Sequence, residues 1–440
     1  MDSKIIAILI AAIVVSAGIG YYAGTMVAPS GVDDYQTGYD EGYVQGFADG
    51  EFPNGVLKIG VTGPMTGALA SEGDEFLKGV TMAVEEINAR GGLCGYKLEI
   101  VSGDTEDFEP GKITAIYEKL ITQDNVDAIF TGYASQTQNE FEICKRYDMI
   151  YFVSADAMAT EEIIGAAPED YPTIFNTVTS YISYQTELPK RMEQWASEGK
   201  IDLPNRKVAI ITSDNYYSSW ISEGLRDNFE AINWEITMYE MVPFGTYTEW
   251  GPMLEKIRSD PPALIVNTDY IASNEATFME QFLQNPTQSH MFIQYGPSTP
   301  EFISLLGDSS TGVIYNSPSL GIYVESYKQG VALGAKFKNR WGFDPGSYGP
   351  SLYVQVMIWA QAVEMVGDPK DHLAVGEAIL DNTAYWGTGG LVTFDPSTHL
   401  CDIRYSTPTF YQIWDGNRYV VDPEPYNNGE IQNPPWWSEG

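Results

Sequence analysis

Twice along this chain, short apolar segments alternate with longer segments that have the period of an amphipathic helix. In the first series, strands are expected at 56–61, 97–101, 128–130 and 149–153, and helices at 76–89, 111–122 and 138–146. Strands that alternate with helices of this length need crossover connections, which make the strands parallel and cover both faces of the sheet. The first part of the chain is therefore expected to be an α/β lobe.

The same alternation begins again after residue 205. Strands are expected at 206–212, 235–241 and 263–267, and helices at 220–231, 250–259 and 274–284. Because 440 residues are enough to bury two separate cores, we expect two doubly wound parallel-sheet lobes. Glycine and proline residues mark three places where the chain can cross between them and form a three-segment hinge, near 177–180, 316–319 and 391–396.

These crossings predict how the chain is divided. The first lobe would consist of residues 56–178 and 318–393, and the second of residues 179–317 and 394–425. Residues 426–440 would form a C-terminal tail, and residues 1–28 and 29–55 would precede the lobes.

The first 28 residues have the composition of a membrane segment. Ile5 to Ala28 carry no charge, and at about 1.5 Å per residue a helix of this length spans the roughly 30 Å of a bilayer core. We interpret the segment as an N-terminal transmembrane anchor. A cleaved secretory signal, with small residues at 16–18 as the cleavage site, is the alternative. Both interpretations place the rest of the chain outside the cell, either anchored to the membrane surface or secreted.

Residues 29–55 are acidic and contain a fourfold repeat of an aromatic residue followed three positions later by glycine, from Tyr35 to Gly50. A period of four residues would place the aromatic side chains on one stripe of a helix, beside a stripe of glycines. One interpretation is a stalk through which two copies associate, together with the anchor. The other is a flexible spacer.

Charge and motifs exclude several classes of function. Sixty acidic residues against 24 basic ones give a net charge of -36, which disfavours nucleic acid as a partner. The three cysteines and three histidines are scattered, so a structural metal site is not expected. The sequence has no nucleophile elbow, phosphate loop or HExxH helix, so we predict neither an enzyme nor a bound cofactor.

The loops that follow the expected strands are rich in Ser, Thr, Tyr and Asp. Because ligands of open parallel sheets bind beyond the carboxyl ends of the strands, these loops predict a cleft for a small polar ligand. They are residues 62–72, 131–137 and 154–158 of the first lobe, and 213–217, 268–270 and 295–298 of the second.

Five stretches resemble the extracellular solute-binding proteins of the branched-chain amino acid and amide class, which are bilobed receptors that serve ABC transporters. The longest stretch is residues 58–113, with a Gly-Pro-x-x-Gly turn after the first strand and Gly-Gly-x-x-Gly before the second. The others are IFTGYASQTQ at 129–138, VSADAMAT at 153–160, VAIITSDNYYSSW at 208–220 and GGLVTFDPSTH at 389–399. The resemblance extends over about residues 56–425.

The resemblance implies a set of ligand-binding positions. In the family, loops after the third and fourth strands hold the polar end of the ligand, and aromatic residues of the opposite lobe close over it. The matching first-lobe positions are Ser135, Thr137, Ala157 and Met158, with Gln136 and Asp156 adjacent and Glu72 in the first loop. The matching second-lobe positions are Tyr217, Tyr270 and Tyr295.

One position departs from the family pattern. Amino-acid receptors of the family place a carboxylate beside a Gly-Pro pair to bind the ligand ammonium, and this chain has Ser298 after Gly296-Pro297. Asp156 or Asp269 could replace that carboxylate, or the ligand could be an uncharged amide or a urea-like molecule.

The resemblance implies that the protein captures a small polar solute and delivers it to an ABC permease in the membrane. The alternative is a membrane-tethered sensor or surface scaffold that uses the same cleft.

Cysteine positions lead to one further expectation. Cys94, before the second strand, and Cys144, at the end of the third helix, both belong to the first lobe. Because an exported chain meets an oxidising environment, we expect these two residues to form a disulfide, with buried free thiols as the alternative.

Overall fold

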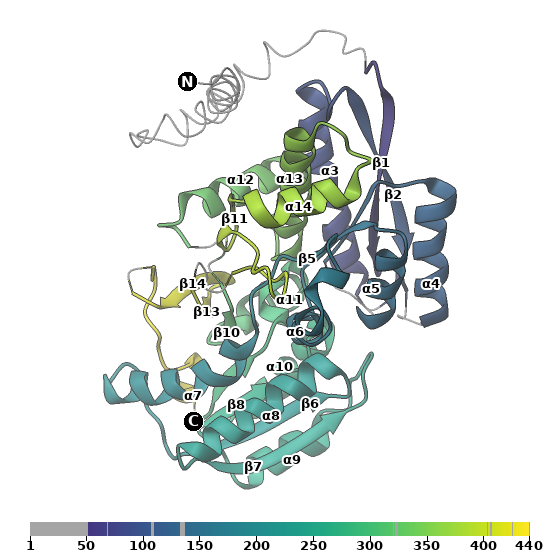
Figure 1. Ribbon diagram of the computed structural model, residues 1–440. Coiled ribbons are helices and arrows are strands. Elements are labelled where there is room, and N and C mark those ends of the chain that lie inside the picture. Colours follow the sequence, from purple (N-terminus) through teal and green to yellow (C-terminus); the bar gives the residue numbers. More distant parts are fainter. Residues whose placement is uncertain are drawn as a thin grey trace, which may run out of the picture. The chain divides into compact units, whose positions relative to one another are not determined.

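The computed structural model describes residues 52–67, 69–106, 110–132, 137–319, 321, 324–402, 404, 407–424 and 426–439. Residues 52–88 and 92–440 form one compact unit, which contains two α/β lobes (Figure 1). The expected anchor, residues 29–51 of the expected stalk, and both Ser135 and Gln136 lie outside the described residues.

The first lobe is built on a sheet of five parallel strands. They are β1 (Gly55–Gly63), β2 (Tyr96–Asp104), β3 (Ala128–Thr131), β4 (Ile150–Val153) and β5 (Ile174–Asn176), in the order β2-β1-β3-β4-β5. All residues of β3, β4 and β5 are buried, as expected for central strands covered on both faces. The parallel sheet expected for this part of the chain is confirmed.

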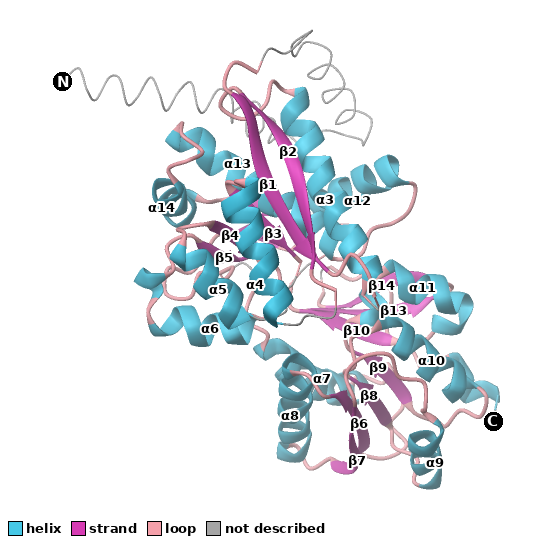
Figure 2. Ribbon diagram, turned by 90° about the vertical axis from the view of Figure 1, so that its right-hand side faces the viewer, coloured by secondary structure: helices cyan, strands magenta, loops and turns pink. Residues whose placement is uncertain are grey.

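Helices cover both faces of this sheet. One face packs against α3 (Ala70–Ala89), α13 (Tyr348–Val366) and α14 (His372–Asn382), beside α12 (Lys328–Trp341). The other packs against α4 (Pro110–Lys119), the π-helix η1 (Leu120–Asp124), α5 (Thr137–Arg146) and α6 (Ala157–Ala166), which precedes η2 (Pro168–Asp170). In Figure 1, α3 and α13 lie on one side of β1 and β2 and α4 lies on the other, and Figure 2 shows β1 and β2 running side by side.

The second lobe repeats the winding of the first and then extends it. Its sheet contains β6 (Lys207–Ser213), β7 (Glu235–Val242), β8 (Leu264–Asn267), β9 (His290–Ile293), β10 (Ile314–Ser317), β13 (Thr409–Trp414) and β14 (Asn417–Asp422), in the order β14-β13-β10-β9-β8-β6-β7. The strands β6 to β10 are parallel to one another. β13 pairs antiparallel with β10, and β14 pairs antiparallel with β13. The doubly wound parallel sheet expected for this lobe is present in β6 to β10, and the strands β13 and β14, which the sequence analysis did not expect, extend it with antiparallel pairs. Asp415 and Gly416 have φ values of 49° and 71°, which suit a tight hairpin turn.

Helices also cover both faces of the second sheet. On one side are α7 (Ile182–Ser197) and α8 (Tyr216–Ala231), and on the other are α9 (Gly251–Ser259), α10 (Ala272–Leu283) and α11 (Pro300–Leu306). Short helical turns η3 (Gly296–Ser298) and η4 (Gly307–Ser310) flank α11. Near the C-terminus, η6 (Pro435–Glu439) brings Trp436 into the core of this lobe, beside Phe282.

Three segments join the lobes, after β5, after β10 and after the small hairpin of β11 (Tyr385–Gly387) and β12 (Gly390–Val392). The first and third lie side by side. Asn176 pairs with Leu400, and the Cys401 amide donates to the carbonyl oxygens of Asn176 at 3.0 Å and Val178 at 3.1 Å. The connections between the lobes are therefore hydrogen-bonded to each other.

The expected disulfide is wrong, because Cys94 and Cys144 are both free thiols on opposite faces of the first sheet. Cys94 packs toward α13, with its Sγ 3.7 Å from the Val363 carbonyl oxygen. Cys144 is buried in the cluster beneath α4 and α5. A disulfide requires the two Cα atoms to lie within about 7 Å, and the sheet stands between these residues.

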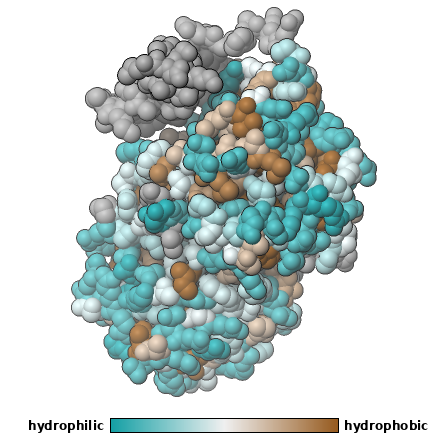
Figure 3. Space-filling view, in the orientation of Figure 1, coloured by the Kyte–Doolittle hydropathy of each residue, from teal (hydrophilic) through white to brown (hydrophobic). Residues whose placement is uncertain are grey.

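The face of the described body in Figure 3 is mostly polar, and hydrophobic residues form only small patches on it. Within the described residues, no helix combines the length and the apolar character needed to cross a bilayer.

Candidate functional site

A cavity of about 220 Å³ lies between the two lobes, beyond the carboxyl ends of strands from both sheets. Its wall includes residues that follow β4, β8 and β9, together with residues of all three segments that join the lobes. Elements far apart in the sequence meet here because the carboxyl ends of parallel strands from both sheets lie where the two lobes meet. This position is where parallel sheets usually bind ligands.

Tyrosine dominates the wall of the cavity. The tyrosines that line it are Tyr181, Tyr184, Tyr217, Tyr270, Tyr295, Tyr315, Tyr348 and Tyr411. Several form a continuous chain of ring contacts: the centroid distances are 5.7 Å for Tyr181–Tyr217, 5.6 Å for Tyr217–Tyr270, 6.2 Å for Tyr270–Tyr295 and 5.8 Å for Tyr295–Tyr348. The first three pairs are edge to face, an arrangement that aromatic pairs favour.

Hydroxyl groups form a second part of the wall. Ser154, at the end of β4, lies 2.6 Å from the Thr177 hydroxyl and 2.7 Å from the Ser351 hydroxyl. The buried Gln355 amide donates to Ser154 at 2.8 Å and to Thr177 at 3.1 Å. This network connects β4, the first joining segment and α13, and it fixes the positions of the hydroxyls before a ligand arrives.

Asp156 is the acidic residue at the start of α6. It lines the cavity, and one carboxylate oxygen accepts a hydrogen bond of 2.6 Å from Thr137 Oγ1. Its φ of 52° is left-handed, a conformation that aspartate tolerates better than most residues. Burial raises the pKa of Asp156 to about 6, and the Thr137 hydrogen bond opposes that rise.

The structure brings together four of the expected site residues, because Asp156, Tyr217, Tyr270 and Tyr295 all line the cavity. Thr137 lies behind Asp156 and holds its carboxylate.

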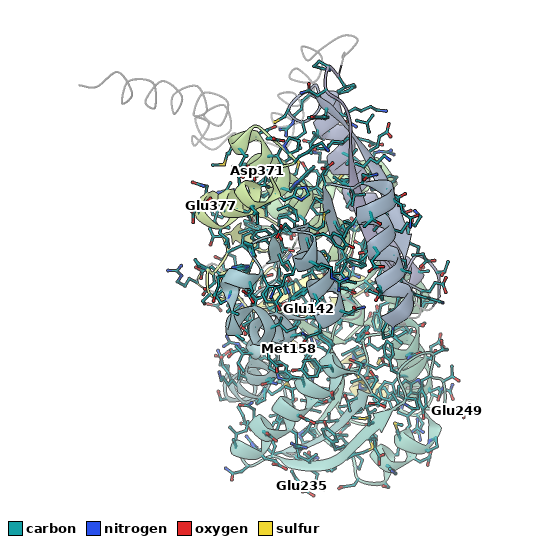
Figure 4. All side chains as sticks on the ribbon, turned by 45° about the vertical axis from the view of Figure 1, so that its right-hand side comes forward. Glu142, Met158, Glu235, Glu249, Asp371 and Glu377 are labelled. Atoms are coloured by element: carbon teal, nitrogen blue, oxygen red, sulfur yellow. The ribbon has the colours of Figure 1, made fainter. Side chains whose placement is uncertain are left out.

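Ala157 and Met158 are placed differently, since both are buried among core residues of α7 and α8. Figure 4 shows Met158 at the end of the first lobe that faces the second. These two side chains pack the junction and are not among the described residues that line the cavity.

Glu72 is buried in α3 and is also absent from the described cavity wall. Ser71 Oγ lies between the carboxylates of Glu72 and Glu301, which links α3 of the first lobe with α11 of the second. Burial raises the pKa of Glu72 to about 8, against the hydrogen bond from Ser71.

Asp269 does not reach the described wall either. It is fully buried and accepts a hydrogen bond of 2.7 Å from the Asn274 side chain, so it supports the start of α10. Glu275, also on α10, lies against the backbone of Gly296, where burial raises its pKa well above the ordinary value. The Gly-Pro loop that lacks its own acid is therefore backed by an acid from a neighbouring helix.

Several cavity residues were missing from the expected set. Tyr181 and Tyr184 come from the joining segment and the start of α7, and Tyr348 and Ser351 from the first turn of α13. The expected positions follow strands, whereas these residues stand at the starts of α7 and α13. The Ser-Tyr-Gly-Pro-Ser run at 347–351, which begins a long apolar helix, was the available signal. Among the described residues, no group of His, Cys, Asp and Glu side chains could hold a metal ion.

Comparison with known proteins agrees with this geometry. Residues 56–404 match the family described as periplasmic binding protein. The leucine-, isoleucine-, valine-, threonine- and alanine-binding protein of Pseudomonas aeruginosa is 23% identical over 348 residues, which cover 79% of this chain and 88% of that protein.

Solved structures share the fold. A Silicibacter pomeroyi protein assigned to a branched-chain amino acid ABC transporter has a TM-score of 0.75 and 28% identity, with 87% of this chain and 100% of that chain covered. The branched-chain amino acid substrate-binding protein of Streptococcus pneumoniae, in complex with isoleucine, has a TM-score of 0.69 and 19% identity, with 84% and 100% covered. With the family match spanning most of its length, this chain belongs to the periplasmic binding protein family.

Proposed function

We propose that this protein is an extracellular receptor that encloses a small polar solute between its lobes and delivers it to an ABC permease. The observation that carries the proposal is the composition of the cavity wall. Ser154, Asp156 and Ser351 of the first lobe supply hydrogen-bonding groups. The tyrosines come mainly from the second lobe, which also supplies Ser298 and Asn316. A ligand that contacts both walls would stabilise the closed arrangement of the lobes.

The relatives support the same class of solute. The Pseudomonas aeruginosa relative is named for binding five amino acids, and the Streptococcus pneumoniae structure contains isoleucine. We therefore propose an amino acid, an amide or a urea-like molecule of comparable size.

A thermal-shift screen of the full-length protein tests ligand capture. At least one member of an amino-acid, amide and urea library at millimolar concentration is expected to raise the melting temperature, because a ligand that binds only the folded state stabilises it. The proposal fails if no member does so. Co-purification with a permease subunit tests delivery.

Small-angle scattering tests whether the ligand closes the lobes. Tyr217 packs against Tyr181 and Tyr270 at the cavity, so Tyr217→Ala removes part of the second-lobe wall. We expect weaker ligand binding and, at saturation, a larger radius of gyration than the parent. A variant as compact as the parent when saturated would assign this tyrosine to packing alone. Tyr216→Ala, at an exposed neighbouring position, is the matched control.

A further inference from the structure

Tyr295 lines the cavity from an unfavourable backbone conformation. It follows β9, and its φ of 98° and ψ of -59° lie in a region that large side chains rarely adopt. A residue keeps such a conformation only where its surroundings impose it. The contacts around residues 295–299 must therefore hold this tyrosine in place.

Hydrogen bonds within the loop supply part of this restraint. The Ser298 amide donates to the Tyr295 carbonyl oxygen at 2.8 Å. The Thr299 amide and hydroxyl donate to the Gly296 carbonyl oxygen at 2.9 Å and 2.8 Å. The backbone of Gly296 also lies against the buried Glu275 carboxylate, which a Cβ atom at this position would overlap. These contacts determine the shape of the turn at its start.

Arg418 of β14 attaches the far end of the loop to another element. Its Nε donates to the Pro297 carbonyl oxygen at 2.7 Å, and its Nη2 donates to the Thr299 carbonyl oxygen at 2.6 Å. Because the guanidinium group is planar and rigid, two such bonds fix both the position and the orientation of the loop. The half-buried Arg418 side chain thus connects the loop that carries Tyr295 to the C-terminal hairpin.

The position of Tyr295 affects both lobes. Its ring centroid lies 6.2 Å from that of Tyr270 in the second lobe and 5.8 Å from that of Tyr348 in the first. The chain of ring contacts therefore crosses between the lobes at Tyr295. We call this chain the tyrosine wall; it consists of Tyr181, Tyr217, Tyr270, Tyr295 and Tyr348. A shift of the loop would break the wall at this crossing.

We propose that Arg418 is a positioning residue for the solute cavity, which acts through the backbone of residues 297–299 to keep Tyr295 in the tyrosine wall. The proposal rests on the proposed function, because it concerns binding in the same cavity. Arg418 itself is not among the described residues that line that cavity, so its effect on a solute is indirect.

A purely electrostatic role of Arg418 is the alternative. Burial raises the pKa of Glu75, in α3 of the first lobe, to about 7, and the nearby charge of Arg418 opposes that rise. Lysine keeps the positive charge but lacks a planar group with two donors in fixed directions. Arg418→Lys therefore separates the two roles, whereas Arg418→Met removes both.

The second lobe also offers a matched control. Arg258 donates from Nε to the Asn285 carbonyl oxygen at 2.9 Å and from Nη2 to the Gln281 carbonyl oxygen at 3.2 Å. These two carbonyl groups lie at the C-terminal end of α10, and neither residue is among the described ones that line the cavity. Arg258→Met therefore removes the same kind of paired bond away from the cavity.

Hydrogen exchange of the full-length proteins, without any added compound, measures how firmly the loop is held. In Arg418→Met and Arg418→Lys, we expect the Ser298 and Thr299 amides to exchange at least about tenfold faster than in the parent. In Arg258→Met they should exchange at the parental rate. Parental exchange in both Arg418 variants would overturn the proposal. Parental exchange in Arg418→Lys alone would also overturn it, in favour of the electrostatic role.

A fluorine label reports on the ring itself. With fluorotyrosine incorporated only at position 295, the fluorine resonance should have the same chemical shift in the parent and in Arg258→Met. It should move in both Arg418 variants, because the ring leaves its contacts with Tyr270 and Tyr348. Faster exchange with an unmoved resonance would mean that Arg418 stabilises the loop without positioning the tyrosine, which would contradict the proposal.

A thermal-shift comparison separates this inference from the proposed function. Members of the amino-acid, amide and urea library that stabilise the parent should raise the melting temperature of both Arg418 variants less than that of Arg258→Met. Equal shifts in all variants would overturn the role in binding and leave the proposed function standing. If no member stabilises the parent, the proposed function fails together with the role in binding, and the exchange and fluorine measurements still decide whether Arg418 positions Tyr295.

Discussion

The two lobes have the same winding but present different chemistry to the cavity between them. In each sheet the first five strands follow the same order, so the same loops meet at the junction. The first lobe contributes hydroxyls and Asp156, which are positioned by hydrogen bonds, whereas Tyr217, Tyr270 and Tyr295 of the second contribute ring surface. Topology thus determines which loops meet, and the side chains of those loops determine what can bind.

The lobes also differ in how they are completed. The first receives α13, which returns from beyond the second lobe and packs across α3. The second receives the antiparallel hairpin of β13 and β14, followed by Trp436. Each lobe therefore depends on residues far along the chain for its packing.

The largest effect is expected where α3 and α13 cross in the first lobe. A Cβ atom on Gly79 would lie 2.0 Å from the Gly349 carbonyl oxygen, and backbone cannot move aside as a side chain can. Gly79→Ala should lower the free energy of unfolding by more than about 4 kcal/mol or prevent folding. Urea denaturation measures the change.

The second lobe offers a matched position for that test. In α8, a Cβ on Gly224 would lie 2.1 Å from the Gln185 side chain, which can change rotamer. Gly224→Ala should therefore cost clearly less than Gly79→Ala. Equal losses would show that the two helix pairs are packed with the same rigidity.

The contact between α3 and α11 makes stability depend on pH. One hydroxyl proton of Ser71 cannot serve both carboxylates, so the contact is satisfied when Glu72 is protonated. Burial raises the pKa of Glu72 from 4.5 in the unfolded chain to about 8 in the folded protein. The stabilisation from protonated Glu72 is therefore complete below about pH 4.5 and is lost as pH rises through 8. At about 1.4 kcal/mol per pKa unit, the loss amounts to at most roughly 4 to 5 kcal/mol.

Glu72→Gln should flatten this decline, which denaturation at several pH values would measure. Glu85→Gln is the control in the same helix. The hydrogen bond from Arg340 lowers the pKa of Glu85, so its contribution is lost only on acidification and leaves the slope above pH 5 unchanged. An unaltered slope in Glu72→Gln would assign the dependence to other groups.

A smaller effect is expected at the C-terminus of the second lobe. Trp436 is 5% exposed, its ring lies 5.6 Å from that of Phe282, and its Nε1 donates to the Ser289 carbonyl at 3.1 Å. Trp436→Ala should cost about 3 kcal/mol. Trp386, which is 53% exposed, supplies the control, since Trp386→Ala should change stability by no more than about 0.5 kcal/mol.

The smallest effect is expected in the hydroxyl network. Ser351→Ala removes the bond to Ser154, which keeps its contacts with Thr177 and Gln355, so the cost should be about 1 kcal/mol. Ser219→Ala should cost less, because the Ser219 hydroxyl donates to the Asn215 and Tyr216 carbonyl oxygens at the start of its own helix. A loss above about 3 kcal/mol for Ser351→Ala would mean that the whole network depends on this hydroxyl.

Much of the fold could be predicted from the sequence because segments such as 206–212 contain a short apolar run, here Val208 to Ile211. The errors have physical causes. The helix expected from Phe76 begins at Ala70. Its first turns were missed because their buried side chains include the acids Glu72 and Glu75, which do not count as buried in a hydrophobicity pattern. The hairpin of β13 and β14 was missed although Asp415-Gly416 is a turn signal.

The site could be predicted in part for a related reason. The ends of strands can be predicted from a sequence, and the loops that follow them contain Asp156, Tyr217, Tyr270 and Tyr295, all of which line the cavity. Tyr348 reaches the cavity only because α13 returns across the first lobe, a fact of topology that local pattern does not contain. The cysteine pairing failed in the same way, because sequence distance does not reveal on which face of a sheet a residue lies.

The paired first and third joining segments have a mechanical consequence. Two chain segments that are paired side by side, as Asn176 and Leu400 are, have to bend together. Such a pair bends easily about one axis and resists twisting and lateral shear between the lobes. The lobes would then approach along a single arc, and the tyrosine wall would return to the same register against Asp156 after every cycle.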